Sequence, residues 1–189
     1  MRNKKITGII LHSKPFFEND KLIELFSPTE GRIKLLAKYA QKRHQIFGGR
    51  LEPLNHVELV LYKGSSFQLI TQCDLLTTFP TIRNRFNTLS MAFYICNIVR
   101  KATLFDQHNH ALFSLLFETL QQLNQQTETS LSILQETFEK KFLETEGLLD
   151  ESSHKIPLTF RSQFEAYVGE KLCQPLQLTT PPPIAKVTL

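Results

Sequence analysis

The pattern of the sequence changes abruptly at Pro80, and this change restricts the fold more than any single motif. Five of the seven glycines precede Pro80, among short apolar runs bounded by turn residues. From there to residue 146 there is almost no Gly or Pro, and apolar residues recur at helical spacing. We therefore expect an α+β protein with strands in residues 1–80, an all-helical domain in 81–175 and an extended, proline-containing tail in 176–189.

Five runs in the first part are rich in Ile, Leu and Val and predict a small five-stranded barrel. They are Ile6–His12, Lys21–Ser27, Arg32–Lys38, His56–Lys63 and Phe67–Gln72. Gly31 and Gly64 supply the positive φ that tight hairpin turns require. The segment from Tyr39 to Glu52 is too long for a tight hairpin, so it holds either a short helix or a mobile loop.

Four stretches after Pro80 have apolar stripes at helical spacing. The predicted helices cover about 87–105, 110–125, 130–146 and 159–172. The predicted helix at about 87–105 is apolar around most of its circumference, so we expect it to lie at the centre of the helical domain. Gly147 is expected to end the third helix and Pro175 the last.

Several classes of protein fit the sequence poorly. Three scattered cysteines, Cys73, Cys96 and Cys173, suit neither a disulfide framework nor a zinc site with paired ligands. No signal peptide, membrane span, nucleotide-binding glycine motif or nucleophile elbow is recognisable. We expect a soluble cytoplasmic protein without cofactor, metal or catalytic residues.

Positive charge is concentrated in the strand-rich part. Residues 1–80 hold 12 basic and 7 acidic side chains, whereas residues 81–189 hold 10 and 11. The stretch from Arg32 to Arg50 contains no acid, and aromatic residues are interleaved with its cations or lie close by, as Phe16, Phe17 and Phe67 do. Such a run suits a phosphate backbone, and the rings suit stacking on bases, as in an OB-fold that binds single strands. The predicted DNA-binding residues are Arg32, Lys34, Lys38, Tyr39, Lys42, Arg43, Phe47 and Arg50.

Catalytic or metal-binding interpretations of the polar residues have less support in the sequence. Asp106, His108 and His110 form the best catalytic or metal-binding candidate, but nothing nearby completes a ligand set, and a polar loop between helices explains them. The acidic residues between Glu144 and Glu151 are read as a solvated face. A hydrolase built on Asp106, His108 and His110 is kept as the least favoured hypothesis.

The order of segments resembles the RecO family of bacterial recombination mediators over about 170 residues. Ile6–Ser13 is similar to the family's opening strand, and Phe17-Glu-Asn-Asp-Lys21 to its aromatic-x-Glu-x-Asp-basic stretch. Further similarities are the turn from Ser27 to Gly31, Leu51-Glu-Pro53, the Phe138-Glu…Phe142-Leu…Gly147 helix and the closing helix at Leu158–Leu172.

The resemblance implies an OB-fold packed on a helical domain, with no enzymatic activity. It also implies binding of single- and double-stranded DNA, annealing of complementary strands, partnership with RecR, and help in loading RecA onto DNA covered by single-stranded-DNA-binding protein. Docking of that protein's acidic C-terminal tail is expected beside the helical domain, with Arg83, Arg85, Arg100 and Lys101 as candidate cations. The expected location is the cytoplasm, associated with the nucleoid.

Two positions depart from the family's pattern. Members often have Gly after the lysine that ends strand three, whereas this chain has Lys38-Tyr39, which predicts a different loop path. Many members also insert a four-cysteine zinc module after the glycine of the helical domain, whereas here Gly147-Leu-Leu-Asp150 runs almost directly into the closing helix. The alternative from another functional class is a protein-interaction adaptor that uses the barrel face and binds DNA only incidentally.

Overall fold

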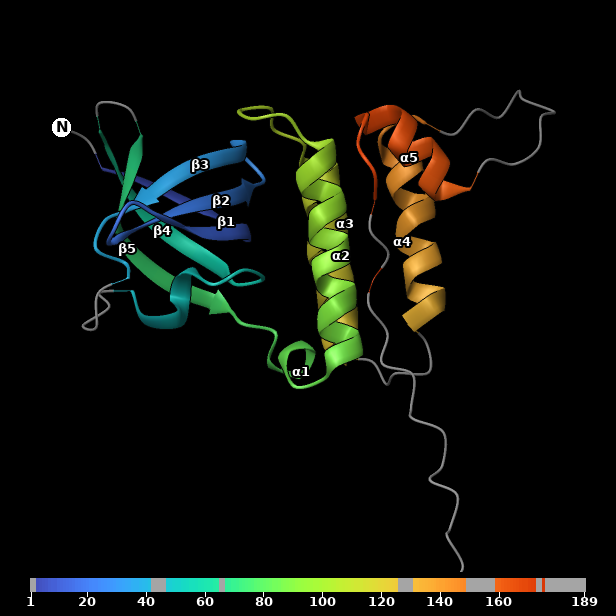
Figure 1. Ribbon diagram of the computed structural model, residues 1–189, viewed down its shortest axis with the longest axis horizontal. Coiled ribbons are helices and arrows are strands. Elements are labelled where there is room, and N and C mark those ends of the chain that lie inside the picture. The colour runs from blue at the N-terminus through green and yellow to red at the C-terminus, as the bar shows by residue number, and fades with distance from the viewer. Residues whose placement is uncertain are drawn as a thin grey trace, which may run out of the picture.

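The first part of the chain is a closed barrel of five strands. The computed structural model describes residues 3–41, 47–64, 67–125, 131–148, 159–172 and 175. The strands are β1 (Lys4–Phe16), β2 (Asp20–Ser27), β3 (Gly31–Ala37), β4 (His56–Lys63) and β5 (Gln68–Thr77), in the order β1-β2-β3-β5-β4 around the barrel (Figure 1). All neighbours are antiparallel except β3 and β5. The predicted α+β architecture, an OB-fold barrel followed by helices, is confirmed.

Strand alternation gives the barrel an inner and an outer face. Ile23 and Leu25 of β2, and Ile33 and Leu35 of β3, belong to the barrel core. Their even-numbered neighbours therefore point outward. β1 is long enough to pair with two strands and so closes the barrel. Its first half pairs with β4 and its second half with β2, and its register shifts between Ile10 and His12, close to where the two pairings meet.

The segment expected to be a short helix or a loop contains, among its described residues, the 3₁₀ turn η1 (Gly48–Leu51). Asn55, which is only 3% exposed, holds this turn by donating from Nδ2 to the carbonyls of Gly49 and Arg50, each at 3.0 Å. Leu51 and Phe47 then enter the barrel core.

The helical part consists of α1 (Pro80–Arg83), α2 (Phe86–Ala102), α3 (His110–Gln125), α4 (Leu131–Thr145) and α5 (Phe160–Val168). α2 and α3 lie next to the barrel, and α4 and α5 lie on their far side (Figure 1). α2 contacts β1, α3, α4 and α5, so its predicted central position is confirmed. Gly147, with φ +68°, follows the end of α4 as expected.

Two helices end earlier than predicted. α2 stops at Ala102 because Thr103 is extended, and Phe105 then forms a bridge with Arg32 of β3. α5 stops at Val168 because Gly169 adopts φ +73° and ends the helix. Within the part of the chain that is described, no helix has the length and apolar character needed to cross a membrane.

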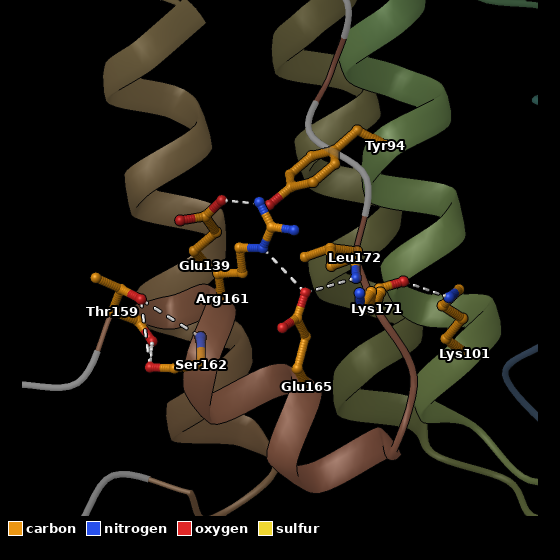
Figure 2. A network of polar contacts seen from close by, with 9 residues as sticks. All are labelled: Tyr94, Lys101, Glu139, Thr159, Arg161, Ser162, Glu165, Lys171 and Leu172. Atoms are coloured by element: carbon orange, nitrogen blue, oxygen red, sulfur yellow. Dashed lines mark hydrogen bonds and ion pairs between the residues drawn. The ribbon is translucent and has the colours of Figure 1, made fainter.

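The residues after α5 fold back onto the helical core as a short strap, residues 169–172. Glu165 accepts the backbone N–H of Leu172 at 2.9 Å, and Lys101 donates to the strap carbonyl of Lys171 at 2.8 Å (Figure 2). Leu172 is only 1% exposed. Tyr94 on α2 donates to a carboxylate oxygen of α4 at 2.6 Å, so polar contacts join α2, α4 and the strap.

Candidate nucleic-acid interface

Three phenylalanines from two connections meet at one end of the barrel. The rings of Phe16 and Phe17, at the β1–β2 turn, lie 4.4 Å apart between centroids. Phe67, just before β5, lies 6.0 Å from Phe16. Phe17 is 82% exposed, the highest value among the large apolar side chains in the described residues. In OB-folds, the loop between strands 1 and 2 and the loop between strands 4 and 5 border the binding face.

Tyr39 belongs to the same end of the barrel. Its backbone N–H donates to Asp20 Oδ1 at 2.9 Å, and the N–H of Gln41 donates to the carbonyl of Asn19 at 2.9 Å. The chain that leaves β3 is thereby fixed to the β1–β2 turn, with the Tyr39 ring 51% exposed. We call Phe16, Phe17, Tyr39 and Phe67 the aromatic end.

Two of these aromatic residues have a left-handed backbone, at φ +52° for Phe17 and +57° for Tyr39. Glycine adopts this conformation without strain, whereas a side chain with a Cβ is disfavoured by about 1–2 kcal/mol. Tyr39 therefore has a backbone conformation that glycine would adopt more readily, and the different loop path expected after Lys38 stays a prediction. Strain of this kind clusters at functional sites.

Lysines border the aromatic end on the outer face of the barrel. In the β1–β2–β3 register, Lys14 lies opposite Leu22 and Leu22 opposite Leu36, while Lys34 lies opposite Glu24. Lys14, Lys34 and the adjacent Lys38 are exposed. The face of strands 1–3 thus presents cations beside rings, the combination that single-stranded nucleic acid requires.

The same face continues toward the helices through a buried ion pair. Arg100 of α2 binds Glu24 through both carboxylate oxygens, from Nε at 2.8 Å and from Nη2 at 3.1 Å. Arg32 donates to the carbonyl of Arg100 and places its guanidinium 3.9 Å from the centre of the Phe105 ring. Lys34 lies 4.2 Å from the same ring.

Electrostatics at this junction favour the charged pair. Burial alone would raise the pKa of Glu24, but hydrogen bonds and positive charge from Arg100, together with the charges of Arg32 and His12, lower it. The bond to Glu24 raises the pKa of Arg100, while burial lowers that of Arg32. The junction therefore depends on an ionised Glu24 at neutral pH.

The predicted DNA-binding residues separate in space. Lys38 and Tyr39 lie at the aromatic end, and Lys34 lies on the outer face beside the junction. Lys42 and Arg43 fall outside the described residues. Arg50 donates from Nη1 to the Cys73 carbonyl at 3.4 Å.

Two of the predicted assignments need correction. Phe47 is 4% exposed in the barrel core, so its ring is not available to stack on a base. Arg32 faces α2 and the α2–α3 loop rather than solvent, because it spans the junction between barrel and helices.

The cations predicted to dock an acidic tail are largely engaged within the chain. Arg83 donates to the carbonyls of Thr78 and Pro53 and to Asn55 Oδ1 at 2.7–3.1 Å. Arg100 is paired with Glu24. Lys101 forms an ion pair with Glu170 at 2.9 Å in addition to its contact with the strap. Arg85 directly precedes α2. Arg83, Arg100 and Lys101 thus have partners within the chain, and their role in docking an acidic tail stays a prediction.

The catalytic or metal-binding candidate of the sequence, Asp106, His108 and His110, lies beside the barrel–helix junction. The backbone N–H of Asp106 donates to the carbonyl of Arg32 at 2.9 Å, and the side chains of His108 and His110 are exposed. His110 approaches Ser114 at 3.5 Å. Within the described residues, no group of three His, Cys, Asp or Glu is arranged to hold a metal ion.

Comparison with known proteins gives two successive matches. The family model "Recombination protein O N terminal" matches residues 1–79, and "Recombination protein O C terminal" matches residues 83–151. The chain belongs to the Recombination protein O family. The first match covers the barrel, and the second covers α2, α3 and α4 in full, so the family's two parts follow the two parts of the structure.

Several proteins named DNA repair protein RecO align with most of this chain. The protein from Alkaliphilus metalliredigens is 30% identical over 144 residues, covering 76% of this chain and 58% of the relative. That from Acetivibrio thermocellus is 32% identical over 149 residues, covering 78% and 58% respectively. The chain thus spans somewhat under two thirds of the length of these RecO proteins. The predicted loss of a four-cysteine module after Gly147 concerns residues 149–158, which lie outside the described residues.

The predicted DNA-binding residues include only part of the aromatic end and its bordering lysines. Phe16, Phe17 and Phe67 were noted only as neighbours of the basic run, and Lys14 was not selected. Phe16 and Phe67 are far apart in the sequence, so the sequence alone does not indicate that their rings contact each other. A usable signal was the family-like stretch that begins at Phe17, because an aromatic residue in a tight turn between strands is poorly placed to enter a core.

Proposed function

We propose that this chain is a non-enzymatic DNA-repair and recombination mediator of the RecO type. Residues 1–80 bind single- and double-stranded DNA, and residues 81–175 contact protein partners. The barrel anneals complementary strands and, together with RecR, helps to load RecA onto DNA covered by single-stranded-DNA-binding protein. The printed name of the relatives, DNA repair protein RecO, supports the repair role.

The aromatic end beside exposed lysines carries this proposal. Phe17 is held in solvent by a strained turn, and an exposed ring offers a base a stacking surface worth roughly 1–3 kcal/mol. Lys14, Lys34 and Lys38 can neutralise phosphates along the same face, which releases counterions and lets a second strand approach. Neither step requires a nucleophile or a metal.

Binding of labelled single-stranded and duplex DNA over a salt series, measured by fluorescence anisotropy, tests the proposal. Phe17→Ala should weaken single-strand binding roughly fivefold or more while leaving the salt dependence unchanged, because it removes a ring and no charge. Phe93→Ala is the matched control, since Phe93 is also exposed, at 43%, but lies on α2. Absence of binding at low salt would refute the proposal.

Strand annealing by the same sample, without nucleotide and with chelator present, tests the mediator activity. Annealing that persists under these conditions supports a mechanism without metal or nucleotide. A failure to anneal, combined with tight binding of an acidic peptide to the helices, would favour the adaptor reading. The exposed Phe86 and Phe93 on α2, at 45% and 43%, are the observation that keeps this second candidate in view.

A further inference from the structure

The junction between the barrel and α2 is strongly cationic. We call His12, Lys14, Glu24, Arg32, Lys34 and Arg100 the basic seam. His12 lies directly opposite Glu24 in the β1–β2 register, and Lys34 lies opposite Glu24 on β3, so these side chains share the outer face with Lys14. One buried carboxylate is thus surrounded by four permanent cations and one histidine.

Hydrogen-bond donors outnumber acceptors at the basic seam. Arg32 Nε is buried and has no acceptor among the described residues. Burying a charged donor without an acceptor is unfavourable, so clusters of this kind are complemented by an anion. A second carboxylate that acts on Arg100 is that of Glu170, which is 65% exposed and pairs with Lys101.

Arg100 can bind a second anion without releasing Glu24. A guanidinium has five N–H donors on a planar fork and can engage one anion on each of two edges. Glu24 occupies the edge formed by Nε and Nη2. The Nη1 edge remains on a side chain that is 35% exposed. Its planar geometry suits two oxygens of a phosphate.

His12 lies opposite Glu24, the residue that Arg100 binds. Arg100 of α2, Glu24 of β2 and Lys14 of β1 act on its imidazole. Burial lowers the pKa of His12, Arg100 and Lys14 lower it further, and Glu24 opposes them. His12 is therefore neutral at pH 7, and an anion placed between His12 and Arg100 would favour its protonated form.

We propose that the basic seam is a phosphodiester-binding subsite for the nucleic-acid backbone, in which Arg100, Lys14 and His12 contact one phosphate and His12 takes up one proton from solvent. This inference rests on the proposed DNA binding and adds a second contact to it. Bases stack at the aromatic end, and the backbone then continues along the outer face of β1–β3 to the seam.

The experiment measures binding of a labelled oligothymidylate at about pH 6 and about pH 8, with the full chain at fixed ionic strength. Wild-type protein should bind roughly three- to tenfold tighter at the lower pH, because one added proton can strengthen binding by up to tenfold for each unit of pKa shift. His12→Gln should abolish this gain, because glutamine cannot take up the proton. His110→Gln, which removes an exposed histidine at the start of α3, should retain the gain.

An abasic strand of the same length separates the two contacts. Its binding should keep the pH gain, because the seam contacts phosphate, and should no longer respond to Phe17→Ala. Lys14→Gln provides a second variant and should lower the slope of log affinity against log salt by about one.

The outcomes separate the two proposals. Absence of DNA binding at either pH would overturn the proposed function. Normal binding with the same pH gain in His12→Gln as in wild type, or with an unchanged salt slope in Lys14→Gln, would overturn the seam subsite alone. A pH gain that disappears on the abasic strand would show that the seam contacts a base.

Discussion

Replacing Arg100 with methionine should destabilise the protein in a pH-dependent way. The substitution keeps most of the aliphatic packing of the side chain and removes the guanidinium that binds both oxygens of Glu24, whose side chain is only 7% exposed. Breaking a buried pair costs about 3–5 kcal/mol when it leaves an uncompensated charge. Because the Arg100 side chain is 35% exposed, solvent screening reduces the expected loss to about 2–3 kcal/mol at pH 7.

The pH dependence follows from the shifted pKa of Glu24. The folded-state pKa is lowered, so in the wild type the pair contributes stability above the unfolded-state pKa and loses it as pH falls through the folded value. In Arg100→Met, burial dominates and raises the pKa of Glu24, which protonates more readily. The difference in unfolding free energy between wild type and variant should therefore be smaller at about pH 4 than at about pH 7.

Urea unfolding at about pH 7 and about pH 4, followed by circular dichroism, measures this difference. A loss of 2–3 kcal/mol corresponds to a decrease in Tm of roughly 5–10 °C for a chain of this size. Lys140→Met is the control, because the Lys140–Glu144 pair is exposed and its atoms are 4.0 Å apart, so it should cost less than about 0.5 kcal/mol. Equal losses for Arg100→Met at the two pH values would refute the electrostatic reasoning.

Two further substitutions test how the barrel and the helices are held together. Gly31→Ala should destabilise the protein by more than about 2 kcal/mol, because the backbone of Gly31 has φ +69° and the added Cβ would also clash with the Gln107 carbonyl. Gly48→Ala is the control: its backbone has φ +53° but the space around it is open, so it should cost about 1 kcal/mol in the same urea titration. Phe142→Ala should cost about 3–5 kcal/mol, because the ring is fully buried against other phenylalanines, whereas Phe93→Ala should change Tm by less than about 2 °C. Equal losses of unfolding free energy for Gly31→Ala and Gly48→Ala, or for Phe142→Ala and Phe93→Ala, would contradict this packing.

Periodicity in the sequence was sufficient to predict the five strands and the order of strands and helices. The predicted helix 110–125 matches α3, and the predicted helix 130–146 differs from α4 by one residue at each end. These elements succeed because each depends on its own apolar spacing and on local stop signals such as Gly147. The end of α2 was missed because the residues after Ala102 form contacts with β3, which periodicity within the helix does not encode.

Site residues were harder to predict than elements because strand alternation divides neighbours between two faces. Lys34 and Leu35 are adjacent, yet one is exposed on the outer face and the other lies in the barrel core. Phe17 and Phe47 look alike in the sequence, because each follows an apolar residue and lies near a turn. The first is held outside by a left-handed backbone, and the second is drawn into the core beside η1.

The acid-free run from Arg32 to Arg50 illustrates why a charge cluster in sequence need not be one site. A strand rises by about 3.3 Å per residue, so the seven residues of β3 separate the ends of the strand by roughly 20 Å. Arg32 at its start reaches the helices, whereas Lys38 and Tyr39 just after its end reach the β1–β2 turn. A single strand of nucleic acid laid along the outer face of β3 would pass the exposed Lys34 and Lys38 in turn, since a backbone that carries charge at every nucleotide requires cations spaced along a track. The separation that divides the predicted site is therefore the arrangement that an extended polyanion can use.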